Sequence, residues 1–271
     1  MVSYLSILFM AVSLVISVGL PIGLFLFWRK KHGLKIIPVL VGIAAYIIFA
    51  LILESSLHSL VLHKSVDGKI ALLEYSPLLF ILYGIFAAGI FEETARFISF
   101  FLLRKKYKGI GTGLAYGIGH GGAEAIILVG FVMINTIVMS FLMNSGNAAT
   151  LGSNPAVADQ LNAIATSQPF SFLIPGFERT MAIVSHISLS VLVWCAVNEK
   201  GKRWLFPTAI LLHALLDTAP ALTQAGIITS AFLSEGIILF VTVFISVIAY
   251  RVYRNNLKGG NSFNSGYSAG A

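Results

Sequence analysis

The chain contains seven apolar stretches, each long enough to cross a membrane as a helix. A helix needs roughly 20 apolar residues to span the hydrocarbon core of a bilayer, which is about 30 Å thick. Because backbone groups in lipid must bond within their own segment, such stretches form helices. We therefore predict an all-α, polytopic membrane bundle of about seven transmembrane helices. The predicted spans cover residues 3–28, 35–53, 77–103, 110–143, 170–197, 203–222 and 226–250.

The distribution of Lys and Arg predicts how these helices are oriented. All but four of the 18 basic residues lie in clusters that follow every second span. The other loops contain only Lys64 and Lys69, while Arg96 and Arg179 lie within spans. Since cytoplasmic loops hold the excess of basic residues, we place the amino terminus outside and the carboxyl terminus in the cytoplasm. The clusters lie at 29–35, 104–108, 200–203 and 251–258.

The composition agrees with a membrane protein and argues against a nucleic-acid partner. Hydrophobic residues make up 57% of the chain and charged residues 11%, and the mean hydropathy is +0.90. The net charge of +7 comes from the loop clusters, so we expect contact with membrane lipid and no nucleic acid. Cys195 is the single cysteine, which excludes a disulfide within the chain and a cysteine metal site.

Most of the chain is predicted to form one domain. We expect a single transmembrane helical domain over 1–260, with a catalytic core over 77–222, and a disordered polar tail over 261–271. No Lys or Arg precedes the first apolar run, so we predict a retained helix in place of a cleaved signal peptide. The fourth span is overlong, and its glycines permit a local irregularity. These are Gly117, Gly119, Gly121 and Gly122.

Two outer segments have their own predicted structure. The outer loop over 144–168 lacks Lys and Arg, and Asn154 followed by Pro155 predicts a short helix over 155–165. The segment from Glu54 to Lys64 is predicted to lie along the outer interface, where its two histidines would be solvated. These are His58 and His63.

Ionisable side chains inside the spans are the main functional signal, because they are costly in a bilayer and mark function. Counting about 1.5 Å per residue from the cytoplasmic ends puts Glu92, His120, His186 and His213 at one depth, about 15 to 16 Å. Four consecutive helices therefore deliver two neighbouring carboxylates and three imidazoles to one level. The ionisable residues within spans are Glu92, Glu93, Arg96, His120, Glu124, Glu178, Arg179, His186, His213, Asp217 and Glu235.

Spacing within the helices groups these residues further, since residues four apart share a helix face. His120 shares a face with Glu124, His213 with Asp217, and Glu92 with Arg96. A carboxylate one turn from a histidine can accept a ring N–H and fix the tautomer, which leaves the other nitrogen free for a metal or an oxyanion.

Three imidazoles beside a Glu pair suit zinc-assisted hydrolysis. Neutral nitrogen ligands hold the metal, an open position takes water, and a nearby carboxylate accepts its proton. Our hypothesis is that His120, His186 and His213 are metal ligands or oxyanion donors and that Glu92 or Glu93 is the base. Glu93, on another face, would orient a supporting group. The predicted site opens towards the cytoplasmic half of the bundle.

These motifs resemble the CAAX-protease and bacteriocin-processing (CPBP) class of intramembrane proteases. The resemblance rests on Glu92-Glu93-Thr94-Ala95-Arg96, on Tyr116 with His120, and on the run from His213 to Asp217. Within this class the Gly-His-Gly-Gly-Ala-Glu run at 119–124 most resembles the YhfC branch of predicted intramembrane metalloproteases. PrsW proteases and the gamma-secretase scaffold subunit look like more distant relatives.

The resemblance covers roughly residues 80–220 and implies a function. It implies an endopeptidase of peptide or membrane-protein substrates in a bacterial plasma membrane. Glu92 or Glu93 would be the water-activating base, His120 and His213 would lie at the catalytic centre, and Asp217 would be their polar partner. His186 has no counterpart in these motifs. Two residues separate the Glu pair from Arg96 where CAAX proteases have three, which places Arg96 opposite Glu92, and Tyr116 replaces the usual Phe.

Other interpretations of the same residues remain open. A proton-coupled transporter also arranges His and acidic residues across helices, but commonly shows inverted repeats, which we do not find here. A noncatalytic scaffold would keep the polar cluster for packing and docking. Each histidine taken singly is more often a packing residue. Glu178 and Arg179 form a simple pair near the outer surface in one interpretation and a substrate gate in another, and Glu235 satisfies another polar group of the bundle.

Overall fold

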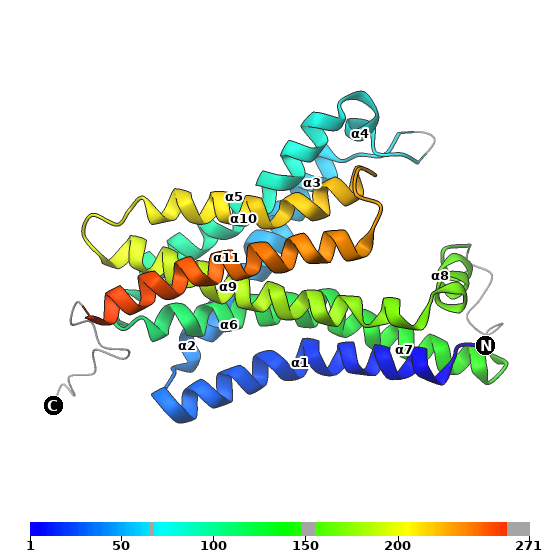
Figure 1. Cartoon of the computed structure of the whole chain (residues 1–271), viewed down its shortest axis with the longest axis horizontal. Helices are drawn as coiled ribbons and strands as arrows, with labels where there is room; N and C mark the ends of the chain where they lie inside the picture. The colour runs from blue at the N-terminus through cyan, green and yellow to red at the C-terminus, as the bar shows by residue number, and fades with distance from the viewer. Residues whose placement is uncertain (66–67, 148–154, 259–271) are drawn as a thin grey trace.

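The computed structural model describes residues 1–65, 68–147 and 155–258, and it is built from helices (Figure 1). Seven helices in this part of the chain are long and apolar enough to cross a membrane, which confirms the predicted all-α polytopic bundle. The spans are Tyr4–His32, Ile36–Val61, Pro77–Leu103, Gly111–Asn144, Pro169–Asn198, Leu205–Gln224 and Ala231–Leu257. Among the described residues, strand pairing is limited to one bridge between Lys64 and Ile70. The predicted tail over 261–271 lies outside them.

Some spans consist of several consecutive helical segments, and short helices lie outside the spans. Pro155–Thr166 forms the short helix predicted after the fourth span. In chain order the elements are α1 (Tyr4–His32), α2 (Ile36–Ala45), η1 (Tyr46–Glu54), α3 (Ser55–Val61), α4 (Ala71–Tyr75), α5 (Pro77–Leu103), α6 (Gly111–Ala125), η2 (Ile126–Gly130), α7 (Phe131–Asn144), α8 (Pro155–Thr166), η4 (Pro169–Phe172), α9 (Ile174–Asn198), α10 (Leu205–Gln224) and α11 (Ala231–Lys258).

The second span is longer than predicted. After Glu54 the same helix continues as α3, so the segment predicted to lie along the outer interface belongs to a candidate span that extends to Val61. Of its two histidines, His63 is exposed as predicted, whereas Nδ1 of His58 lies 2.7 Å from the hydroxyl of Tyr83 in α5. The middle of the span, η1, has the wider turns of a π-helix, a form that often occurs at functional sites.

Helix α9 lies at the centre of the bundle. In its most apolar stretch 78% of the residues are buried, against 22% for α1. Small hydroxyl residues join it to α11, since Oγ of Ser185 lies 3.1 Å from Oγ1 of Thr242. In lipid, where all surroundings are apolar, close packing and such hydrogen bonds hold helices together. The central position of α9 brings its polar side chains into contact with both neighbouring layers.

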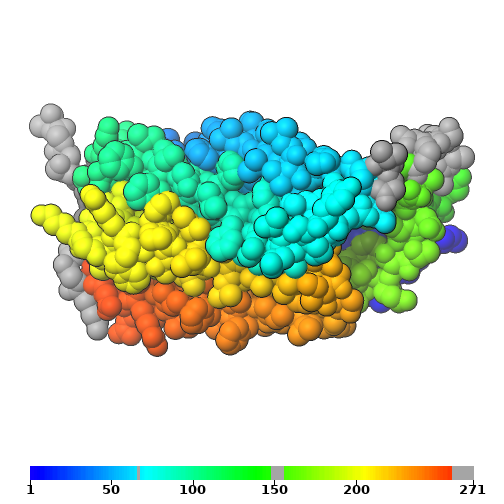
Figure 2. All heavy atoms as spheres, turned by 90° about the horizontal axis from the view of Figure 1, so that it is seen from above, coloured from blue at the N-terminus to red at the C-terminus, as the bar shows by residue number. Residues whose placement is uncertain are grey.

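One face of the bundle is formed by four spans that lie side by side. Figure 2 shows the second span, then α5, α10 and α11 in that order across this face. On the other side of α5 and α10 lie α6 and α9, which pack against each other. The candidate site lies between these two layers.

Glycines of α6 allow its backbone to approach that of α9 closely. A Cβ added at Gly117 would lie only 2.6 Å from Cα of Ile187 in α9. The close approach brings the rings of His120 and His186 to a centroid distance of 4.8 Å. Through its glycines α6 is a regular helix, and the irregularity predicted there occurs later, in the π-helical segment η2. The glycines therefore serve packing.

We expect Gly117→Ala to destabilise the bundle by about 1–3 kcal/mol, because α6 or α9 must shift to admit the methyl group. The midpoint of thermal unfolding in detergent measures this effect. Gly23→Ala is the matched control, since a Cβ at this helical position would meet nothing within 4 Å. Equal unfolding midpoints for the two variants would contradict the packing role.

Candidate active site

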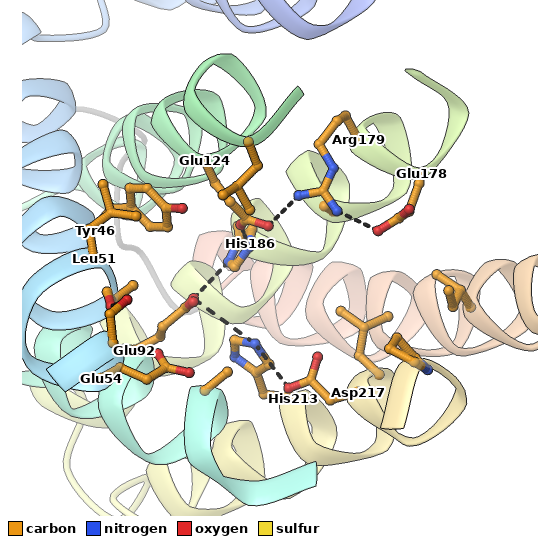
Figure 3. A pocket seen from close by; sticks show the side chains of 18 of the residues that line it. Tyr46, Leu51, Glu54, Glu92, Glu124, Glu178, Arg179, His186, His213 and Asp217 are labelled. Carbon is orange, nitrogen blue, oxygen red and sulfur yellow. Dashed lines mark hydrogen bonds and ion pairs between the residues drawn. The ribbon is translucent and has the colours of Figure 1, made fainter. Parts of the chain in front are cut away.

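A cavity of about 290 Å³ lies between the two layers and is lined by many of the ionisable residues of the spans (Figure 3). Five spans supply polar side chains to its wall, so the cavity is a feature of the bundle and not of one loop. These side chains are Tyr46, Glu54, Ser55 and His58 from the second span, Glu92 from α5, Glu124 from α6, Glu178, Arg179 and His186 from α9, and His213 and Asp217 from α10.

The cavity lies in the half of the bundle that is opposite to the basic loops. On α9 and α10 its lining residues lie between the middle of each helix and the end of the bundle that carries α3 (Figure 1). The prediction that the site opens towards the end with the basic loops is therefore wrong. With the predicted orientation, the cavity faces the outer half of the membrane.

One carboxylate oxygen of Glu92 lies among the nitrogens of three buried histidines. Nε2 of His120 lies 2.8 Å from Oε2 of Glu92, Nδ1 of His186 lies at 3.6 Å and Nε2 of His213 at 4.0 Å. Each side chain comes from a different helix, and each of the four residues is at most 6% exposed. The structure thus brings together the four residues that the depth count places at one level.

Three of these residues could hold a metal ion. Ligand atoms of Glu92, His120 and His186 all lie within 4.8 Å of one another. Two imidazoles and one carboxylate are also the ligands of many catalytic zinc sites. This group differs from the predicted three-histidine set, because Glu92 takes the place of His213 in it.

Glu93 lies behind this group and not in the cavity wall. It is fully buried, and its Oε1 accepts hydrogen bonds from Arg96 and, at 2.8 Å, from Nδ1 of His213. Arg96 therefore pairs with Glu93 at a spacing of three residues, and the prediction that it faces Glu92 is wrong. The ionised carboxylate can only accept, so Nδ1 of His213 carries a proton and its Nε2 points towards Glu92.

Arg96 also fixes the ring of His186. One of its terminal nitrogens lies 3.1 Å from Nδ1 of His186. Since a guanidinium has only donors, Nδ1 accepts this hydrogen bond, and the proton of a neutral ring is on Nε2. That nitrogen lies 2.5 Å from Oε2 of Glu124. Arg96 and Glu93 together orient two of the three histidines, each from the side away from the cavity.

Glu124 has different partners from those predicted. Its carboxylate contacts His186 and Arg179, both in α9, and not His120 on its own helix. Arg179 in turn lies 2.5 Å from Glu178, so the predicted pair of these two residues is present and extends to Glu124. Nδ1 of His120 is buried and has no hydrogen-bond partner in the described residues.

Asp217 lies one turn from His213, as the spacing predicts. Its Oδ2 is 3.7 Å from Nε2 of His213, and this oxygen is buried without a hydrogen-bond partner in the part of the chain that the structure describes. Asp217 lines the cavity. It therefore places a second carboxylate near the nitrogen of His213 that faces Glu92.

Sequence reasoning missed the polar residues of the second span. Glu54 is 6% exposed, lines the cavity, and has Oε1 3.2 Å from Nε2 of His58. The sequence does contain a signal for these residues. Glu54 ends an apolar run and His58 follows it at i+4, which puts both on the same face if the helix continues. Tyr46, also in the cavity wall, packs edge to face on His120.

Comparison with known proteins is consistent with this site. The family described as YhfC intramembrane metalloprotease matches residues 16–238, which include every residue of the cluster around Glu92. An uncharacterized membrane protein, YhfC, of Bacillus subtilis (strain 168) is 36% identical over 261 residues, which are 94% of this chain and 100% of that protein. No solved structure matches the chain. The extent of both matches shows that the chain belongs to the YhfC intramembrane metalloprotease family.

Proposed function

We propose that this protein is a metal-dependent intramembrane endopeptidase that hydrolyses a peptide bond with an activated water. The observation that carries the proposal is the oxygen of Glu92 surrounded by three buried imidazoles at the wall of a cavity. The description of the family supports the same class of activity.

The residues present fit a divalent metal, and we propose zinc. The donor set of Glu92, His120 and His186 is composed of two imidazole nitrogens and a carboxylate oxygen, which is a usual set for zinc. A zinc ion bound there would lower the pKa of water and polarise a peptide carbonyl. All three residues are buried, so their ring orientations are held by packing. Nδ1 of His186, the nitrogen on the side of Glu92, would have to exchange its hydrogen bond from Arg96 for the metal, while Nε2 would keep its contact with Glu124.

Glu92 is the catalytic carboxylate in this proposal. It lines the cavity, whereas Glu93 is enclosed and has Oε1 engaged by Arg96 and His213. Glu93 is therefore a positioning residue. Two roles suit the place of Glu92, namely metal ligand and proton acceptor for the attacking water, and metal content distinguishes them.

His213 is placed to deliver a proton or a hydrogen bond to the reacting group. Because Glu93 holds the proton on Nδ1, a second proton on Nε2 would face the region between Glu92 and Asp217. A donor at this place can stabilise a developing oxyanion or protonate the leaving amine. The carboxylate of Asp217, whose Oδ2 is buried, would hold that proton near the site.

The substrate that fits this position is a peptide bond in or close to a membrane-embedded segment. The cavity lies within the bundle, and its wall includes apolar residues of the second span and η2, such as Leu51 and Leu128. We propose a bacterial plasma membrane as the location, with the cavity in the outer half of the bilayer.

Proteolysis in membrane vesicles tests the proposal. Vesicles with the wild-type chain should show new peptide amino termini within membrane proteins by mass spectrometry, and a chelator should abolish them until zinc is added back. His213→Ala should remove them, while His63→Ala, an exposed histidine away from the cavity, should not. Identical termini for wild type and His213→Ala would contradict an enzyme, and loss of a bound partner instead of termini would favour a scaffold.

A further inference from the structure

A second concave surface lies where α1, η4, α9 and α11 meet. This groove has a volume of about 420 Å³, within the size range of ligand sites. Its wall is formed by apolar side chains, among them Ile16, Phe170, Leu173 and Phe232, and its one acidic residue is Glu235. We call this surface the Glu235 groove.

One carboxylate oxygen of the half-buried Glu235 has no hydrogen-bond partner within the described residues. Its Oε2 is buried and makes no hydrogen bond there, although the sequence predicts that another polar group of the bundle satisfies it. A buried polar atom without a partner costs about 1–3 kcal/mol. Ionisable residues in a membrane span are therefore kept where they serve a function, so Glu235 calls for a ligand that donates a hydrogen bond.

The carboxylate distinguishes this groove from other hollows of similar size. A groove of about 370 Å³ between α1, α2 and α6, and one of about 420 Å³ further along α9 and α11, contain no Asp, Glu, Lys, Arg or His. Acyl chains of any lipid can fill such apolar hollows. The Glu235 groove adds one charge, which requires a cationic or hydrogen-bond-donating group at a defined place.

The depth of Glu235 and the aromatic rings near it suit a lipid headgroup. Glu235 lies about 6 Å from the start of α11, at the end of the bundle that carries α8 (Figure 1). The rings of Phe170 and Phe232 stack at 5.9 Å in the same groove, and the two residues are 49% and 73% exposed. Aromatic faces beside a carboxylate attract ammonium groups.

We propose that the Glu235 groove binds a phospholipid with a primary ammonium headgroup, such as an ethanolamine lipid. The ammonium donates a hydrogen bond to Oε2 of Glu235 and lies near the Phe170 and Phe232 rings. An acyl chain packs along Ile16 and Leu173. A lipid is the occupant because exposed apolar side chains of α11, including Phe240, face the bilayer on this helix. A choline headgroup lacks the N–H that the carboxylate needs.

Native mass spectrometry of the full chain in detergent tests this site. Phosphatidylethanolamine, phosphatidylcholine and phosphatidylglycerol are added separately, and bound lipid is counted for wild type, Glu235→Gln and Phe232→Ala. We expect ethanolamine lipid to bind wild type most strongly and Glu235→Gln to lose about tenfold in affinity, the loss expected for one hydrogen bond to a charged group. Glu74→Gln removes a carboxylate that pairs with Lys69, at the same end of the bundle, and should bind as wild type does.

Two outcomes would overturn the proposal. Equal binding of all three lipids, unchanged in Glu235→Gln, would mean that the apolar walls alone retain lipid. Binding of a lysine-containing hydrophobic peptide, added as a further probe, without selective binding of ethanolamine lipid would identify a peptide as the occupant. Circular dichroism spectra that match wild type establish that the variants are folded, so a lost signal reports on the groove.

Discussion

Replacing Glu92 by glutamine is expected to lower proteolysis by about 10²- to 10⁴-fold while the bundle stays folded. Glutamine keeps the size of the side chain but cannot accept a proton from water or bind a metal as a carboxylate does. Glu92 lines the cavity and lies 2.8 Å from Nε2 of His120, so the change removes a charge at the centre of the site. The count of new peptide termini in vesicles measures the effect.

The same variant distinguishes the two roles of Glu92. If Glu92 is a metal ligand, zinc content falls together with activity, and if it is the proton acceptor, zinc content is retained. Glu74→Gln is the control, because this carboxylate lies outside the cavity wall. Wild-type levels of cleavage in Glu92→Gln would remove Glu92 from the mechanism.

Replacing Arg96 by methionine is expected to destabilise the protein by about 3–5 kcal/mol, because it leaves Glu93 charged and buried without its cationic partner. Both side chains are fully buried, and Arg96 donates to Glu93 and to Nδ1 of His186. The free energy of unfolding in detergent with added denaturant measures the change. The loss should exceed that of Gly117→Ala.

The double variant Glu93→Gln, Arg96→Met tests the reason for this loss. Replacing both partners removes the uncompensated charge, so the double variant should be more stable than Arg96→Met alone. It should still lose activity, since His186 would lack its hydrogen bond from Arg96 and a neutral amide at position 93 would accept from Nδ1 of His213 more weakly than the carboxylate does. A double variant less stable than Arg96→Met would contradict the buried-charge explanation.

The spans could be predicted from sequence because lipid allows the backbone few alternatives. Each crossing segment must satisfy its own hydrogen bonds, so a long apolar run predicts a helix with little dependence on its neighbours. The depth of each side chain within the membrane could also be predicted, because a helix rises by a fixed amount per residue. This is why Glu92, His120, His186 and His213, from four helices, lie together in the structure.

The partners of the site residues could not be predicted because contacts between helices decide them. Spacing within one helix pairs Glu124 with His120, but Arg179 and His186 of the central helix α9 reach Glu124 instead. Arg96 likewise selects Glu93, one residue off the expected face. The second span also supplies residues to the cavity wall, and hydropathy alone does not predict its continuation past Glu54, although the i+4 spacing of Glu54 and His58 agrees with a continuing helix.

The most direct test of the central claim is the metal content of the purified full chain, measured by inductively coupled plasma mass spectrometry. The variants compared are a His120→Ala, His186→Ala double variant and His63→Ala, each matched to wild type in folding and monodispersity. We predict about one zinc per chain in wild type and in His63→Ala, and a loss of most zinc in the double variant. No stoichiometric metal in wild type, or equal metal in the double variant, would contradict a metal site at Glu92, His120 and His186.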